Sequence, residues 1–196
     1  MLPVPFNSLP NAALKTKQLT KGEILFRQSD PPSFLYFLRS GHVQLRRHTE
    51  AGEDIIIHNA HGGQTFAEAS LFSSNYHCDA IACEASELVA INKIQILKTM
   101  RQNSLFAFAL SARFATEMQA QRRKLELFSI KSAPQRIFAA IADGMLTGSV
   151  TALAADIGLT HEATYRALSQ LTRQGKLVKT GRGRYELRKI ESRTTG

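Results

Sequence analysis

The feature that most constrains this chain is a change in the spacing of its apolar residues near Ile94. Before it, from Leu14 to Ile91, apolar residues occur in short alternating segments that are separated by turn residues, as in His42–His48. Many short segments of this kind predict antiparallel strands in a sandwich, roll or barrel. After it, apolar residues recur every three or four positions, which predicts helices. The chain is therefore expected to be α+β, with a β-roll followed by a helical part.

Turn residues divide the alternating region. The residues Ala51-Gly52-Glu53-Asp54 are expected to form a hairpin turn, and Gly62-Gly63 a second break. Leu19 and Ile24–Phe26 lie on either side of Lys21-Gly22-Glu23. Further short segments of this kind are Phe34–Leu38, His42–His48, Ile55–His58, Ala80–Cys83 and Leu88–Ile91.

A long helix is expected to follow the strands, after a short one over Ile94–Met100. Asn103 or Ser104 can cap it, and its apolar residues continue to about Phe128. A helix of roughly 25 residues rises about 37 Å, which is more than a small roll needs. A second copy of the helix can cover the remaining apolar stripe, as in a coiled-coil-like dimer. The expected dimer residues are Leu110, Phe114, Met118, Gln121 and Leu125. Packing of the stripe onto its own roll is the alternative.

A new helix is expected after this one. Ser132-Ala-Pro-Gln135 has the capping-box pattern, with Pro in the first turn, and predicts a helix over Ala133–Ala142. The domain boundary is placed at 128–132. The expected organisation is an effector-sensing β-roll at 1–100, a dimerisation helix at 101–130 and a DNA-binding domain at 131–196.

The C-terminal part has the pattern of a winged helix-turn-helix. One short helix is expected over Val150–Gly158, and a second over Thr160–Gln174, with Gly158 in the turn between them. The N-terminal residues of such a second helix face the major groove of DNA. The expected DNA-binding residues on it are Thr160, His161, Glu162, Tyr165 and Arg166. Arg can read guanine and Glu can accept from cytosine.

A hairpin with glycines at its turn follows as Lys176–Leu187 and is expected to form the wing. Arg173, Lys179, Arg182 and Arg184 would contact phosphates and position the protein rather than read sequence. An ordinary solvated surface is the alternative for all of these charges.

The charge distribution agrees with a nucleic-acid partner. The net charge is +9, and residues 1–100 contain nine Lys/Arg and nine Asp/Glu, so the excess lies in the C-terminal half. A basic module attached to a neutral one favours binding to phosphates. There is no apolar run long enough to span a bilayer and no secretory pattern, so a cytoplasmic protein without a membrane partner is expected.

Several motifs resemble those of the CRP/FNR superfamily of bacterial regulators. They are Lys21-Gly22-Glu23, Ser40-Gly41-His42-Val43, Gly63-Gln64-Thr65-Phe66-Ala67-Glu68 and Thr160-His-Glu-Ala-Thr-Tyr-Arg166. The resemblance covers roughly residues 15 to 188. It implies a cyclic-nucleotide-binding-domain-like β-roll (a double-stranded β-helix), a homodimer, an operator in double-stranded DNA, RNA polymerase as a further partner, and a small effector. The family commonly has Arg-Glu-x3-Arg in its recognition helix, whereas this chain has His161 at the first position and keeps Glu162 and Arg166.

The sensor region departs from the members of the family that bind cyclic nucleotides. Their phosphate cassette has Gly-Glu-Leu-Gly followed by Arg-Ser-Ala; this chain has Ala67-Glu68-Ala69-Ser70, and then Cys78-Asp79-Ala80. Cys replaces the arginine that would pair with the phosphate, and Asp would repel it. No cyclic nucleotide is therefore expected. The expected effector pocket comprises Glu68, Ala69, Ser70, His77, Cys78 and Asp79.

The sequence leaves the cofactor and the signal open. The odd spacing of Cys78 and Cys83 points them to opposite faces of a strand, so no disulfide is expected between them. Cys78 can be a structural core residue, a redox sensor with a low pKa, a ligand of haem or metal together with histidines, or a contact to an organic ligand. No Cys precedes Cys78, so no iron–sulfur cluster is expected.

Two other classes of protein are weaker matches. A cupin-like metalloenzyme would need a His-x-His pair, whereas the nearest arrangement here is His58-x-x-His61 with Glu68. No nucleotide loop or nucleophile elbow is present, so an enzyme is not expected. An interaction module that only keeps the DNA-binding shape is the third alternative.

Overall fold

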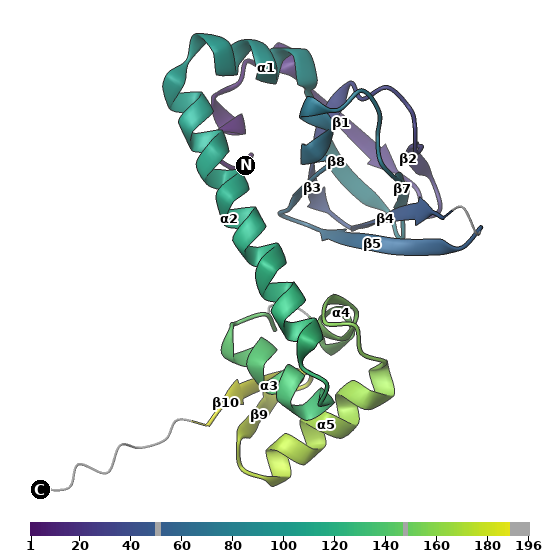
Figure 1. The fold of residues 1–196 in the computed structure, drawn as a ribbon, viewed down its shortest axis with the longest axis vertical. Coiled ribbons are helices and arrows are strands. Elements are labelled where there is room, and N and C mark those ends of the chain that lie inside the picture. The colour runs from purple at the N-terminus through teal and green to yellow at the C-terminus, as the bar shows by residue number, and fades with distance from the viewer. Residues whose placement is uncertain (50–51, 147–148, 189–196) are drawn as a thin grey trace, which may run out of the picture. The chain divides into compact units, whose positions relative to one another are not determined.

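The computed structural model describes residues 1–49, 52–146 and 149–188. The chain divides into two compact units, Met1–Phe114 and Ala115–Gly196, and helix α2 (Ser104–Ser129) continues from the first into the second (Figure 1). The segment 101–130, which the sequence suggests as a separate part, is thus divided between the two units. Ala51 of the predicted hairpin turn and the segment 189–196 lie outside the described residues. Among those described, no helix is long and apolar enough to cross a membrane.

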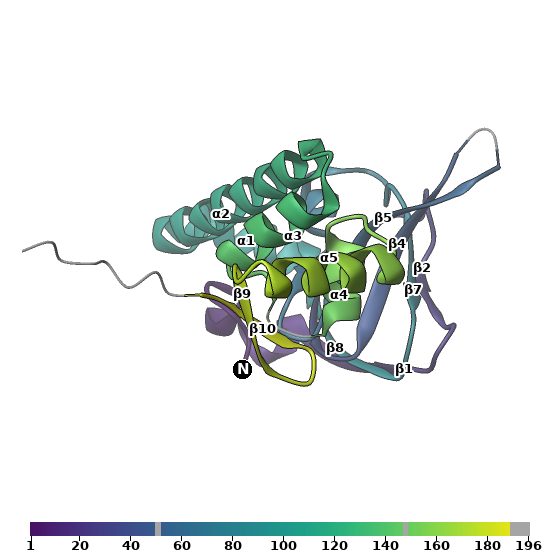
Figure 2. The same cartoon turned by 90° about the horizontal axis from the view of Figure 1, so that it is seen from below.

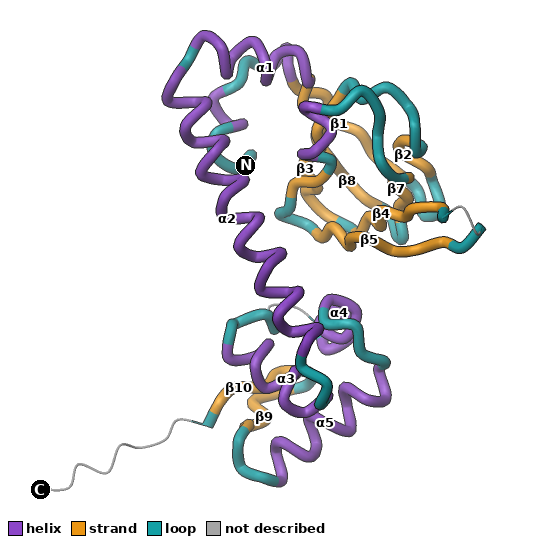
Figure 3. The backbone as a smooth tube through the Cα atoms, in the orientation of Figure 1, coloured by secondary structure: helices purple, strands orange, loops and turns teal. Residues whose placement is uncertain are grey.

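The first unit contains the predicted β-roll, built from two four-stranded antiparallel sheets (Figure 3). One sheet has the order β1-β8-β3-β6 and the other the order β2-β7-β4-β5. The strands are β1 (Leu14–Leu19), β2 (Ile24–Phe26), β3 (Phe34–Ser40), β4 (His42–His48), β5 (Asp54–His61), β6 (Thr65–Phe66), β7 (Asp79–Ala82) and β8 (Ser86–Asn92).

The sheet that contains β3 and β8 is buried on both faces. On β3, Tyr36 and Leu38 face the interior of the roll, while Leu35 and Phe37 face a second apolar cluster outside it. Because successive strand side chains point to opposite faces, four consecutive residues can be buried only when both faces are covered. The outer cover includes Phe6 and Leu9 of the N-terminal segment, together with residues of α1 (Lys93–Gln102) and the first turns of α2.

Helix α2 begins at Ser104, as the sequence predicts. The Asn103 side chain caps it by accepting a hydrogen bond from the Phe106 N–H at 3.0 Å. The predicted dimer stripe, however, is partly wrong. Leu110 is fully buried in the outer cluster of its own chain, and Phe114 packs half-buried against the same cluster. These two side chains follow the alternative in which the stripe packs on its own roll, whereas Met118, Gln121 and Leu125 are exposed.

The second unit contains three short helices and a hairpin that surround one core. The helices are α3 (Ala133–Ala142), α4 (Val150–Asp156) and α5 (His161–Arg173), and the strands are β9 (Leu177–Gly181) and β10 (Arg184–Leu187). The hairpin lies beside α5 (Figure 2). Leu127 of α2, Ile137 of α3, Leu153 of α4 and Leu168 of α5 are buried together in the core. This is the winged helix-turn-helix order that the sequence predicts.

Candidate functional site

The turn between α4 and α5 has the geometry of a helix-turn-helix. Thr160 caps α5, its hydroxyl accepting from the Ala163 N–H at 3.2 Å, and Ser149 caps α4 in the same way at 3.1 Å. Gly158 has a φ of +63°. A Cβ at this position would lie 2.5 Å from Cε1 of Phe128, so the backbone favours glycine and any side chain would have to displace the Phe128 ring.

The predicted DNA-reading residues lie on one exposed face of α5. His161, Glu162, Tyr165 and Arg166 are all exposed, and the rings of His161 and Tyr165 meet edge to face, 6.4 Å apart between centroids. The opposite face is anchored in the core by residues that include Leu168 and Leu171. Rigid attachment of one face leaves the other free to enter a groove.

The wing presents cations around a tight turn. Lys179, Arg182 and Arg184 are exposed on β9, the turn and β10, and Arg173 is exposed at the end of α5. Gly183 in the turn has a φ of +72°, which a glycine adopts without strain. The hairpin thus carries its charge around a short turn. Figure 1 shows the hairpin next to α3 and α5.

Sequence reasoning missed the residue that ties this unit together. The guanidinium of Arg136 donates to the carbonyls of Phe128, Ile130 and Ile157, at distances from 2.7 to 3.2 Å. It therefore joins the end of α2, the linker before α3 and the C-terminus of α4. Its partners are backbone carbonyls, so no residue pairing in the sequence indicates this role.

Two further details on α5 were also missed. Ser169 and Gln170 are exposed one turn after Tyr165 and Arg166, and the four-residue spacing places them on the same face. Thr164 is fully buried, and its hydroxyl donates to the Thr160 carbonyl at 2.9 Å.

Basic residues near the end of α2 are engaged in ion pairs inside the second unit. Arg123 Nη2 lies 3.0 Å from a carboxylate oxygen of Asp143, and Lys124 Nζ lies 3.4 Å from Asp156. Arg123 also pairs with Glu126. These cations stabilise α2 against α3 and α4, so the charge of the wing and α5 is the better candidate for phosphate contacts.

In the first unit, the predicted effector residues have different environments. Cys78 is buried in the apolar interior of the roll, together with Phe26, Tyr36 and Tyr76, whose rings stack. Burial raises the pKa of the Cys78 thiol, and the nearby Arg47 only partly offsets this. A raised pKa disfavours the thiolate, on which the low-pKa redox sensor considered from the sequence would depend. Both Cys78 and Cys83 are free thiols.

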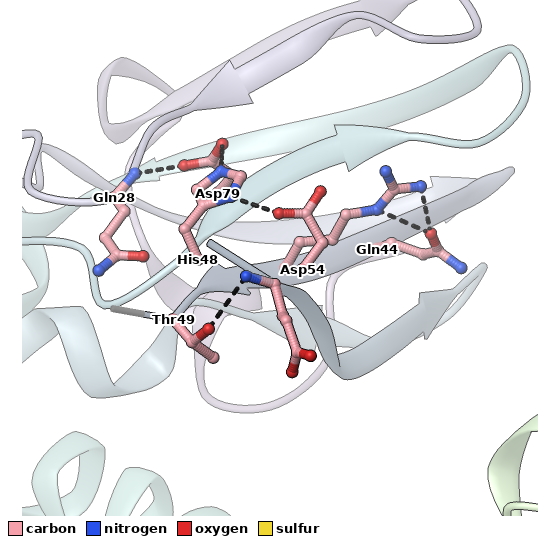
Figure 4. A network of polar contacts seen from close by, with 8 residues as sticks. Gln28, Gln44, His48, Thr49, Asp54 and Asp79 are labelled. Carbon is pink, nitrogen blue, oxygen red and sulfur yellow. Dashed lines mark hydrogen bonds and ion pairs between the residues drawn. The ribbon is translucent and has the colours of Figure 1, made fainter. Parts of the chain in front are cut away.

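Asp79 is buried and fully engaged (Figure 4). One of its oxygens accepts from the Gln28 backbone N–H at 2.6 Å, and the other lies 3.1 Å from Nε2 of His48. Burial alone would raise the pKa of Asp79, but the bond from Gln28 and the contact with His48 outweigh it and lower the pKa. The same network raises the pKa of His48 through its hydrogen bonds to Asp79 and Asp54.

The turn at residues 67–70 has alanine and serine at the positions where the cassette has glycine. Ala67 has a φ of +66°, and its carbonyl accepts from the hydroxyl of the buried Ser70 at 2.5 Å. Lys93 Nζ donates to the carbonyls of Ser70 and Ser73, each at 2.7 Å, and so holds the end of the short helix Glu68–Phe72. Glu68 is half-buried and Ala69 exposed in this helix, while His77 is exposed in the loop before β7.

The structure also shows whether the candidate metal ligands from the sequence come together. Among the residues described, no three His, Cys, Asp or Glu side chains are grouped so that they could hold a metal ion. This applies to Cys78 with its neighbouring histidines and to His58 and His61 with Glu68.

Comparison with known proteins agrees with this architecture. Residues 16–103 match the family described as the cyclic nucleotide-binding domain. The cyclic AMP receptor protein of Thermus thermophilus is 29% identical over 176 residues, which cover 86% of this chain and 81% of that protein.

Two solved structures extend the comparison. The sensor domain of the transcriptional regulator DNR from Pseudomonas aeruginosa is 32% identical, with a TM-score of 0.50, over 56% of this chain and 75% of that chain. FixK2 from Bradyrhizobium japonicum, at 23% identity, has a TM-score of 0.67 over 90% of this chain and 93% of that chain, and so shares the fold. The β-roll, the winged helix-turn-helix and these relatives together show that the chain belongs to the CRP/FNR superfamily of transcription regulators.

Proposed function

We propose that this protein is a homodimeric, sequence-specific DNA-binding transcription regulator, controlled by a signal at its β-roll. The observation that carries the proposal is the exposed face of α5, where His161, Glu162, Tyr165 and Arg166 are held by a buried opposite face. RNA polymerase remains a predicted partner.

In this proposal α5 reads bases in the major groove. The Arg166 guanidinium can donate two hydrogen bonds to O6 and N7 of a guanine, and Glu162 can accept from N4 of a cytosine. Arg173, Lys179, Arg182 and Arg184 contact the phosphates on either side and fix the register of α5 on the duplex. His161 replaces the first arginine of the family pattern, so the base preference is expected to differ at that position.

Arg166→Ala tests this assignment. The variant is expected to lose preference for its operator by at least about tenfold, since a bidentate base contact contributes about 1–3 kcal/mol. Gel-shift competition between specific and unrelated duplexes measures the loss. Arg101→Ala, which removes an exposed arginine from the first unit, is the control and should bind as the unaltered protein does. If Arg166→Ala keeps its sequence preference, α5 is not the reading element.

For the dimer, we place the seam on exposed residues of α2 that include Met118 and Leu125 of the predicted stripe but leave out Leu110 and Phe114. Phe108, Met118 and Leu125 are 76%, 51% and 68% exposed. They fall into a series with alternating spacings of three and four, the repeat of a coiled-coil seam. The full series, all exposed, is Phe108, Ser111, Ala115, Met118, Arg122 and Leu125. We propose this series as the seam between two copies of α2.

We further propose that the roll does not bind a cyclic nucleotide. Cys78 and Asp79 occupy the cassette positions where the family has its phosphate-binding arginine and serine, and stacked aromatic rings fill the space beside Cys78. A cyclic phosphate placed there would meet a carboxylate instead of a cation. Calorimetry with cyclic AMP and cyclic GMP should therefore show no binding at micromolar concentrations. Saturable binding of either nucleotide would contradict this interpretation of the cassette.

A further inference from the structure

A polar groove lies in the first unit, where the end of β4 approaches the loop before β7. Its volume is about 530 Å³, within the range of roughly 300–1,000 Å³ that small-molecule sites have. The residues that line it are Gln28, Ser29, Arg47, His48, Thr49 and Ser73–His77. Of the six residues predicted for the effector pocket, only His77 lines this groove, which shares with the cassette the loop before β7.

The charged side chains of the groove favour an anion. Arg47, His48 and His77 are its basic residues, and the described residues that line it include no Asp or Glu. Arg47 Nε donates to the His77 carbonyl at 3.1 Å, which fixes the guanidinium beside the loop. The terminal nitrogens of Arg47 have no hydrogen-bond partner within the described part of the chain. A guanidinium held in this way can bind a phosphate or carboxylate with two parallel hydrogen bonds.

Carboxylates do lie close behind the groove, but they are engaged. Asp79 and Asp54 both pair with His48, and their hydrogen bonds raise its pKa, so that His48 keeps its positive charge to higher pH. Asp30 accepts from the backbone N–H of Arg27 at 2.9 Å. Within the described residues, none of these three carboxylates pairs with the Arg47 guanidinium.

The neutral lining groups favour a ligand that also carries hydroxyls. Ser29, Thr49, Ser73 and Ser74 bring hydroxyl groups to the groove. The Oε1 atom of Gln28 is buried and has no hydrogen-bond partner among the described residues. A buried acceptor without a donor is unfavourable, and a ligand hydroxyl would satisfy it.

We propose that this groove binds a small hydroxyl-bearing anion, with its phosphate or carboxylate on Arg47 and a hydroxyl on Gln28. Binding of the anion does not depend on the proposed function. The further step, that the anion is the effector of the regulator, rests on the proposed function. The groove would then supply, from strand β4, the cation that the cassette lacks at Cys78.

Calorimetry on the full chain tests the proposal with three probes: ribose 5-phosphate, gluconate and neutral ribose. We expect saturable binding of at least one of the two anions and none of ribose. The anion that binds more tightly identifies the group as phosphate or carboxylate. If neither anion binds, or if ribose binds as tightly, the proposal is wrong.

Matched arginine variants locate the site. Arg47→Gln should weaken anion binding about tenfold or more, because a charge-assisted hydrogen-bonding group is lost. Arg46→Gln is the control. It removes the same charge from the preceding residue of β4, whose guanidinium donates a hydrogen bond to Gln44 Oε1 at 2.7 Å. Arg47→Lys, which keeps the charge without the planar fork, should bind between the two, and circular dichroism checks that each variant is folded. Equal binding by Arg47→Gln and the unaltered protein would overturn the assignment.

These outcomes are separate from those of the DNA experiment. Anion binding can fail while Arg166→Ala still abolishes operator preference, and the reverse result is equally possible. The two measurements therefore test the groove and the proposed regulator independently.

Discussion

Gly158 shows how one residue fixes the angle between α4 and α5. Its positive φ closes the turn, and the absence of a side chain lets the Phe128 ring approach from the end of α2. The sequence predicts the first property, because a glycine between two helical segments indicates a left-handed turn residue. The second property depends on Phe128, which lies thirty positions earlier and has no local signal.

Gly158→Ala is expected to destabilise the second unit more than Gly144→Ala does. Both glycines have positive φ, +63° and +71°, so each alanine should cost about 1 kcal/mol of backbone strain. At Gly144 a Cβ would meet no atom within 4 Å, whereas at Gly158 it would collide with Phe128. The collision should add about 1–3 kcal/mol. Denaturant unfolding of both variants measures the difference, and equal losses of stability would show that the ring moves freely.

The role of Arg136 could not be predicted from the sequence. Its guanidinium bonds three carbonyls, from Phe128, Ile130 and Ile157, that come together only in the folded unit. Thr160, in contrast, caps α5 through a bond to Ala163 three residues away, and such local patterns are visible in the sequence. Residue roles that depend on near neighbours were predictable, and those that depend on distant backbone were not.

At the scale of elements, periodicity gave the type of each segment but not always its partner. The alternation in β4 correctly indicates a strand with one buried face, and the helical pattern after Ile94 correctly indicates α1 and α2. The apolar stripe through Leu110 and Phe114 indicates a buried helix face, but its spacing does not show what covers that face. It packs against an outer cluster that includes Phe6 and Leu9, residues of an N-terminal segment with no regular pattern.

The exposed series on α2 leads to a prediction about assembly. Phe108→Asp and Leu125→Asp should each convert the dimer to monomers, because each replaces an apolar side chain of the seam with a charge that dimerisation would desolvate. Ala120→Asp is the control, since Ala120 is exposed but lies outside the three-and-four spacing of the series. Light scattering on the purified variants gives the mass. Intact dimers with Asp at 108 and 125 would place the interface elsewhere.

At the scale of the whole molecule, the chain joins a charge-balanced roll to a basic helical unit. Residues 1–100 carry equal numbers of acidic and basic side chains, and the excess of the +9 net charge follows them. Within the second unit, Arg123 and Lys124 are paired with acidic residues, while Arg166 and the arginines of the wing are exposed. The exposed basic side chains on α5 and the wing are therefore the ones available to contact DNA phosphates and bases.

The most direct test of the regulator assignment is a selection of bound sequences from a pool of random DNA duplexes, with the full-length protein. The account predicts enrichment of a two-fold symmetric site whose half-sites lie about 10 base pairs apart, or a multiple of that, because a dimer presents two copies of α5. Binding without any enriched sequence, or an enriched site without symmetry, would contradict a dimeric protein that reads DNA through α5.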